Sequence, residues 1–94
     1  MLIGTLSADL ALQGVVSLKQ KRSIVNGVKG RLKSRFNCSI AEVDHQESKI
    51  LATIGLAIVS NDRRFLDQQL DSILAFLRAD GRFFVSRVER EVFS

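Results

Sequence analysis

Residues 2–12 read LIGTLSADLAL, and apolar side chains recur there at every second position. One face of this stretch would carry Leu2, Gly4, Leu6, Ala8, Leu10 and Leu12, and the other would carry Ile3, Thr5, Ser7, Asp9 and Ala11. A period of two predicts a β-strand with one buried face. Gln13-Gly14 breaks the pattern, so the fold opens with a strand that ends near Leu12.

A helix is predicted next. Ser17 and Gln20 have the spacing of a capping box, in which the serine hydroxyl accepts a hydrogen bond from an amide of the first turn and the glutamine reaches back. Apolar residues then follow one stripe of a helix that runs to about Phe36: Leu18, Val25, Val28, Leu32 and Phe36. Lys21 falls inside this stripe. Either its side chain snorkels at the helix start, or the regular helix begins later, nearer Ser23.

The second half of the chain predicts two strands, a helix and a strand. Residues 38–44 (CSIAEVD) and 49–59 (KILATIGLAIV) are β-rich runs separated by the polar segment His45 to Ser48. A helix capped by Ser60 or Asn61 follows and ends at Asp80-Gly81. Residues 83–93 are expected to form a last, partly exposed strand.

The element order βαββαβ indicates an α+β protein with a ferredoxin-like sandwich, in which a four-stranded antiparallel sheet carries both helices on one face. Residues 1–94 suit a single domain. The most apolar strands, 2–12 and 49–59, are expected in the centre and the other two at the edges. Solvated charges on the edge strands would discourage indiscriminate pairing, namely those of Glu42, Asp44, Arg87, Glu89, Arg90 and Glu91.

The composition points to a folded chain with a partner. With 46% hydrophobic and 26% charged residues, it is too apolar for a disordered segment and rather apolar for so small a domain. A homo-oligomer is therefore expected, with a dimer favoured. Its interface would be an edge strand or the helix-free sheet face. That face presents a smooth, moderately apolar surface: Ile3, Thr5, Leu51, Thr53, Gly55, Ala57 and Val59.

Several classes are disfavoured. The single cysteine, Cys38, excludes an internal disulfide and fits the reducing cytoplasm, and at a strand start it is expected to be buried filler. The longest apolar run, 54–59, is too short for a membrane helix. No cofactor motif or metal-ligand spacing occurs, so neither a cofactor nor a metal is expected. We accordingly predict no membrane association.

The predicted first helix is strongly basic. Between Leu18 and Phe36 lie seven of the fourteen basic residues and no Asp or Glu. At 100° per residue, one flank of the apolar stripe carries Lys19, Arg22, Lys29 and Lys33, and the other carries Arg31 and Arg35. A nearly bare face separates them, formed by Ser23, Gly27, Gly30 and Ser34. Such a surface can neutralise the phosphates of a nucleic acid, whose backbone could lie on the bare face, although a solvated face or a packed partner helix also fits.

Catalysis has little support in the sequence, which predicts a protein without enzymatic activity. Glu42, Asp44, His45 and Glu47 are the only cluster. On a strand, Asp44 and His45 would point to opposite faces and could not converge on one metal unless the segment has already turned. An acid–base role for these two would be discarded unless they converge in a pocket. RNA recognition by base stacking on the sheet is also disfavoured, because the central strands contain no aromatic residue.

Segments 17–23 (SLKQKRS), 31–37 (RLKSRFN), 39–46 (SIAEVDHQ) and 59–62 (VSND) together resemble the YlxP-like family of small bacterial proteins, a domain family of unknown function. The resemblance implies a ferredoxin-like fold, a cytoplasmic protein, and frequent gene proximity to translation and ribosome-maturation factors. After Gln46 the chain departs from the family pattern, since Glu47-Ser48-Lys49-Ile50 replaces an aromatic-containing segment. The matching positions, to which no catalytic role is attached, are Ser17, Lys19, Lys21, Arg22, Arg31, Arg35, Asn37, Glu42, Asp44, His45 and Gln46.

The first hypothesis is thus a non-enzymatic RNA-binding or ribosome-associated module that acts through its first helix. Its candidate contacts are Lys19, Arg22, Lys29, Arg31, Lys33 and Arg35. The alternative is a protein-interaction or assembly module that uses the apolar sheet face.

Overall fold

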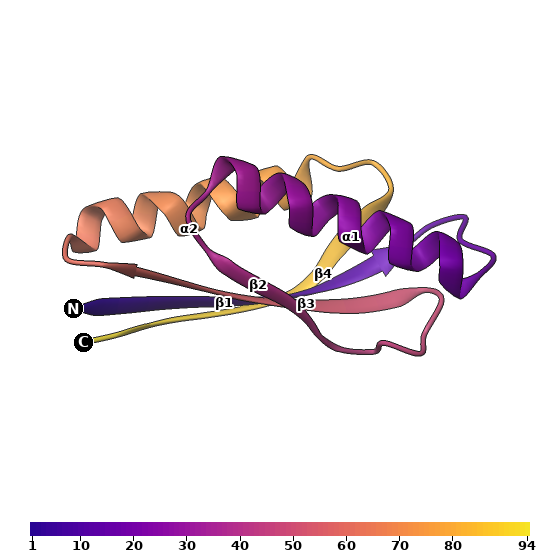
Figure 1. Cartoon of the computed structure of the whole chain (residues 1–94), viewed down its shortest axis with the longest axis horizontal. Coiled ribbons are helices and arrows are strands. Elements are labelled where there is room, and N and C mark those ends of the chain that lie inside the picture. The colour runs from indigo at the N-terminus through magenta and orange to yellow at the C-terminus, as the bar shows by residue number, and fades with distance from the viewer.

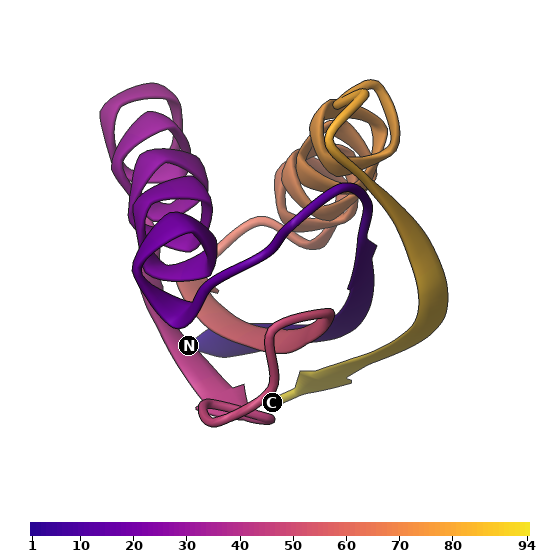
Figure 2. The same cartoon turned by 90° about the vertical axis from the view of Figure 1, so that its right-hand side faces the viewer.

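Two helices cover one face of a four-stranded antiparallel sheet and leave the other face open (Figures 1 and 2). The computed structural model describes every residue from Met1 to Ser94. The elements follow the predicted order, and the ferredoxin-like fold is confirmed: β1 (Leu2–Leu12), α1 (Leu18–Arg35), β2 (Ser39–Asp44), β3 (Leu51–Ser60), α2 (Arg63–Arg78) and β4 (Phe83–Phe93).

The strand order is β2-β3-β1-β4, so the two most apolar strands lie in the centre as predicted. Leu6 of β1 lies opposite Leu56 of β3 and Arg90 of β4. The ladders are interrupted twice. One irregularity falls between Asp9 and Leu10 where β1 pairs with β4, and the other falls between Glu42 and Asp44 where β2 pairs with β3. The second lies directly before the β2–β3 turn, where residues of the candidate site gather.

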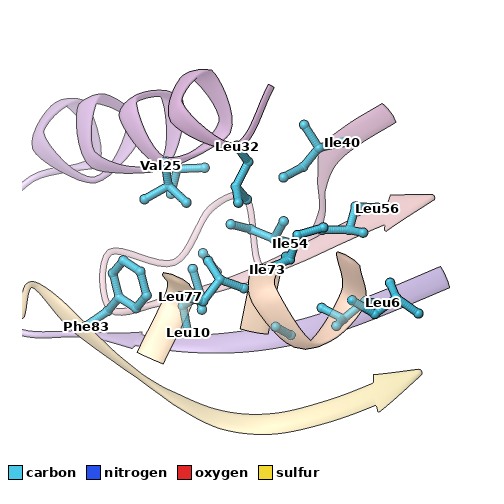
Figure 3. Packing of buried hydrophobic residues seen from close by; sticks show 14 of the residues in the cluster. Leu6, Leu10, Val25, Leu32, Ile40, Ile54, Leu56, Ile73, Leu77 and Phe83 are labelled. Carbon is cyan, nitrogen blue, oxygen red and sulfur yellow. The ribbon is translucent and has the colours of Figure 1, made fainter. Parts of the chain in front are cut away.

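The core lies between the sheet and the helices, and its residues come from the predicted alternation and stripe (Figure 3). Every second residue of the two central strands points toward the helices. Leu6 and Leu10 of β1 and Ile54 of β3 are examples. Val25 and Leu32 of α1 pack down onto them. The open face contributes no residue to this hydrophobic cluster. The side chains on that face are therefore free to contact a ligand or a partner.

The helix starts differ in detail from expectation. Ser17 Oγ accepts the Gln20 amide at 3.1 Å as predicted, but Gln20 Oε1 accepts the amide of Val16 at 3.0 Å rather than that of Ser17. In α2 the cap is Asp62, whose Oδ1 accepts the Phe65 amide at 3.1 Å. The predicted cap, Ser60 or Asn61, is wrong because β3 continues through Ser60. Neither helix combines the length and apolar character that crossing a membrane requires.

Candidate functional site

The six predicted contact residues on α1 all reach solvent, and Lys29 alone among them is half-buried. None of the chain's six ion pairs involves any of these side chains. Because α1 contains no Asp or Glu, the helix itself supplies no counter-charge. The structure therefore leaves six cations along one helix without an anionic partner inside the chain.

The two basic flanks of α1 face different surroundings. Arg31 and Arg35 border a hollow of about 600 Å³ whose other lining comes from the end of α2 and the α2–β4 connection, namely Phe76, Ala79, Asp80, Gly81 and Arg82. The Arg35 guanidinium lies over the Phe76 ring, 5.0 Å from its centroid. Arg22, Lys29 and Lys33 line no part of this hollow. The fold thus places Arg31 and Arg35 on a groove side and Arg22, Lys29 and Lys33 on an outer side. Lys19, which was predicted on the same flank as those three, borders a different hollow.

Arg82 is held rigidly in the α2–β4 connection. Its Nε donates to Asp80 Oδ1 at 3.0 Å and its Nη2 to Oδ2 at 2.6 Å, a two-point contact. This hydrogen bonding, with a smaller contribution from the charge of Arg31, lowers the pKa of Asp80. The same contact raises the pKa of Arg82. Asp80 is therefore ionised at neutral pH and fixes the guanidinium in place.

A second hollow of about 560 Å³ adjoins the first at Arg82, which lines both. Lys19 borders it together with polar side chains of the β1–α1 connection and first helical turns, namely Gln13, Ser17, Gln20 and Ser23, and with Ile24. We call the two hollows together the Arg82 groove. Neither Arg82 nor Phe76 was among the predicted site residues, because nothing in the local sequence around either residue shows that it faces α1.

The cations on the outer side of α1, Arg22, Lys29 and Lys33, line neither of the two hollows. Gly30 is open, since a Cβ built there meets nothing within 4 Å, and one built on Gly27 meets only Arg31 Nη2 at 3.7 Å. The charge of Lys33 acts on the Cys38 thiol. Burial raises the pKa of that thiol and Lys33 opposes the rise, so the group remains a thiol at neutral pH. Cys38 packs half-buried against the core, in keeping with a filling role.

Lys21 is fully buried, and both sequence interpretations of it are wrong. The helix begins at Leu18, and the side chain does not snorkel but ends inside the protein. Its Nζ lies 2.7 Å from Glu42 Oε2 and donates to the carbonyls of His45 at 2.7 Å and Gln46 at 3.4 Å. Glu42 was expected to be a solvated edge charge. Its side chain instead turns inward, because a buried ammonium requires a counter-charge.

Several motif positions of unknown role thus meet at the β2–β3 turn. Lys21 of α1 holds the backbone of His45 and Gln46, and Gln46 Nε2 donates to the Glu42 carbonyl at 3.1 Å. The His45 amide donates to Asp44 Oδ1 at 2.7 Å. These contacts give Lys21, Glu42 and the residues of the turn a shared structural role. Asn37 stays exposed, and its side chain makes no hydrogen bond within the chain.

Asp44 and His45 line one depression of about 270 Å³, because the segment has already turned at His45 and the opposite faces of a strand no longer separate the two side chains. The alternation ends at Asp44 because His45 has a φ of 61° and has left the strand. Ser7, Asp9, Thr53, Arg87 and Glu89 complete the lining. No three of the His, Cys, Asp and Glu side chains are arranged to hold a metal ion.

Hydrogen bonds orient the His45 ring in this depression. Thr53 Oγ1 donates its only hydrogen to Asp9 Oδ1 at 2.8 Å and lies 2.9 Å from His45 Nδ1. The hydroxyl must therefore accept from Nδ1–H, which leaves Nε2 of a neutral ring as an acceptor without a partner in the chain. The two predicted turn residues do converge, so an acid–base role is not discarded by geometry.

The open sheet face is less uniform than predicted. Thr53 is only 7% exposed, and the centre of the face is the polar depression rather than a smooth apolar surface. Exposed apolar side chains remain at its two ends. Val59 and Phe93 flank Ile3 at one end, and Leu51 and Phe84 flank Ala11 at the other.

The molecule is thus a ferredoxin-like domain with an unpaired basic helix, a concave basic groove and a turn locked by a buried ion pair. A family model described as "Protein of unknown function (DUF503)" matches residues 3–90, and the chain belongs to this family. The chain is 30% identical over 76 residues to the uncharacterized protein YlxP of Bacillus subtilis strain 168. The aligned region covers 81% of this chain and 83% of that protein. The resemblance inferred from the four sequence segments is confirmed, and neither description names an activity.

Proposed function

We propose that this protein is a non-enzymatic RNA-binding or ribosome-associated module of the cytoplasm that acts through α1. The observation that carries the proposal is the set of six α1 cations with no anionic partner in the chain. Cations left unpaired on one helix are matched by a polyanion, and binding releases the counterions condensed on its phosphates. The net charge of +4 acts in the same direction by attracting RNA from a distance.

The test is a titration of fluorescent ribosomal RNA fragments, followed by anisotropy at low and near-physiological salt. We expect binding that weakens steeply with salt and is lost when all six α1 cations, Lys19, Arg22, Lys29, Arg31, Lys33 and Arg35, are changed to Glu. Circular dichroism must show that this variant is folded. Salt-insensitive binding, or equal binding by the variant, would contradict the proposal.

A matched control separates position from net charge. Lys49, Arg64 and Arg78 are exposed cations outside α1 that also form no ion pair. Changing these three to Glu alters the net charge as much as changing Lys19, Arg31 and Arg35 to Glu. If α1 is the interface, the control variant keeps most of its affinity while the α1 variant does not.

A second candidate function is assembly through the open sheet face, and the exposed apolar side chains at its two ends favour it. Val59 is 61% exposed, Phe93 48% and Phe84 60%, although all lie on strands of the sheet. A homodimer that covered this face would bury them. Light scattering on the purified protein and its Leu51→Asp variant tests the idea. A dimer that dissociates in the variant supports assembly, and a wild-type monomer at high concentration removes this candidate.

A further inference from the structure

We infer that the nucleic acid bound by this protein is a single RNA strand seated in the Arg82 groove, rather than a duplex lying across the outer face of α1. This inference rests on the proposed RNA-binding function and assigns it a substrate class and a binding surface. Arg82 and Phe76, which lie far from α1 in the sequence, become part of the site.

The charge of the groove suits one phosphate backbone. Four cations line it, namely Lys19, Arg31, Arg35 and Arg82, against the single carboxylate of Asp80, giving a net charge of +3. Arg31 and Arg35 are one helical turn apart, about 6 Å along the axis, and Lys19 lies about 18 Å beyond Arg31. The cations therefore follow the length of α1 and can contact several phosphates spaced along one strand.

The position of the cations favours a single strand. Arg31 and Arg35 come from the α1 side of the groove and Arg82 from the α2–β4 connection, so a bound phosphate has positive charge on both sides. A duplex presents its phosphates on a convex cylinder and would meet only the rims of such a hollow. A single strand can enter, which is how grooves that bind single-stranded nucleic acid commonly work.

The groove also contains a surface on which a base can stack. Phe76 is half-buried beneath the Arg35 guanidinium, which lies 5.0 Å from the ring centroid. Planar aromatic and guanidinium groups both stack on nucleobases. The sheet lacks central aromatics, so in this molecule the stacking surface lies between the helices instead. A strand held there gains base contacts that the outer side of α1 does not offer.

Arg82 is prepared for binding before the ligand arrives. Two hydrogen bonds to Asp80 use one edge of its guanidinium, at 3.0 and 2.6 Å, and leave Nη1 without a partner in the chain. An arginine already fixed in one orientation loses less side-chain entropy when it meets a phosphate. The outer cations Arg22, Lys29 and Lys33 have no such anchor.

The test compares two double variants of α1 with the same spacing and the same loss of charge. Arg31→Gln with Arg35→Gln removes two positive charges from the α1 side of the groove. Lys29→Gln with Lys33→Gln removes two positive charges from the outer side of α1. Wild type and each double variant are titrated with a fluorescent ten-nucleotide uridine strand over a range of salt. The same titration is made with the duplex that this strand forms with a complementary ten-nucleotide adenosine strand. Melting curves establish that both variants fold, and Arg35→Lys retains the charge without the planar group.

We expect the single strand to bind more tightly than the duplex. With four groove cations engaged, log K should fall with log salt with a slope of about −2.8, and with about −1.4 once Arg31 and Arg35 are neutralised. The outer double variant should keep the wild-type slope. Phe76→Leu, which retains an apolar side chain, should weaken binding about tenfold, near the low end of measured stacking contributions.

Two results would overturn the inference. They differ in whether the proposed RNA binding through α1 is overturned as well. If the duplex binds as well as the strand and the outer double variant weakens it equally, the groove assignment fails while RNA binding through α1 survives. If neither RNA binds in either salt range, the proposed function fails and the groove assignment fails with it.

Discussion

Lys21 carries a charged group into a position that the helical pattern reserves for an apolar side chain. Burial of an ammonium is costly, and here Glu42 and two turn carbonyls offset that cost. The Lys21 N–H groups are directed at the carbonyls, and Glu42 Oε2 forms a close charge contact without an aligned hydrogen bond. One side chain thereby ties the β2–β3 turn to α1.

Replacing Lys21 by Met should destabilise the protein by about 3 kcal/mol, because the buried Glu42 carboxylate and the His45 carbonyl lose their partner. Urea unfolding at neutral pH measures the change. Lys19→Met, two residues earlier and exposed, should stay within about 0.5 kcal/mol of wild type. Equal stability of the two variants would mean that the ion pair contributes nothing.

Asp80 predicts a dependence of stability on acidity. Its pKa is lowered in the folded protein by Arg82, so the unfolded chain binds the proton more tightly. The resulting stabilisation is complete above the unfolded value of about 3.9 and is lost as the pH falls through the folded value. Asp80→Asn should therefore be less stable than wild type at pH 7, and the difference should disappear in acid.

Urea unfolding of both proteins from pH 7 down to about pH 2, below the lowered pKa of Asp80, measures this effect. Glu47→Gln serves as the control, since Glu47 is exposed and forms no ion pair. A stability difference for Asp80→Asn that persisted unchanged into acid would show that the substitution acts through packing and not through ionisation.

At the level of elements, α1 is a helix whose sequence is not optimised for stability. Gly30 lies in its interior with open space around it. Gly30→Ala should raise the free energy of unfolding by about 0.8 to 1 kcal/mol. Because Gly30 lies outside the Arg82 groove, single-stranded RNA should bind the variant unchanged. A marked loss of affinity would instead place the strand on the bare outer face.

A backbone control accompanies that variant. Gly14, with a φ of +69°, occupies the left-handed region in the β1–α1 connection. Gly14→Ala should therefore destabilise the protein although nothing lies within 4 Å of the added Cβ. Thermal or urea unfolding of the two Gly-to-Ala variants should thus give shifts of opposite sign.

All six elements could be predicted from the sequence because each has a strong period and clear ends. The misses were local. Asp62 rather than Ser60 caps α2, since strand pairing extended β3 by tertiary contacts that the cap signal does not contain. Glu42, which was expected to be a solvated edge charge, turns inward because it pairs with the buried Lys21 of α1. Neither constraint is visible within a short window of sequence.

Across the whole molecule, the sequence identified the basic helix but not the groove beside it. Arg82 and Phe76 reach α1 only because α2 and β4 fold back across the sheet, and no spacing rule links them to Arg31 and Arg35. Likewise, Asp9, Thr53 and Arg87 come from three different strands and share the depression with His45 through strand register alone. A long-range cluster requires the topology before it can be seen.

The first and last strands run antiparallel side by side, and Ile3 pairs with Phe93 (Figure 1). The eleven residues of β1 span about 36 Å, so both chain ends lie a strand length from the pairing of Leu12 with Phe83 beside the groove. A few glycines could therefore close the chain into a ring. Reopening it at Gly14 would yield a circular permutant with every strand pairing intact, and a tag at either original end would anchor the protein with its groove facing outward.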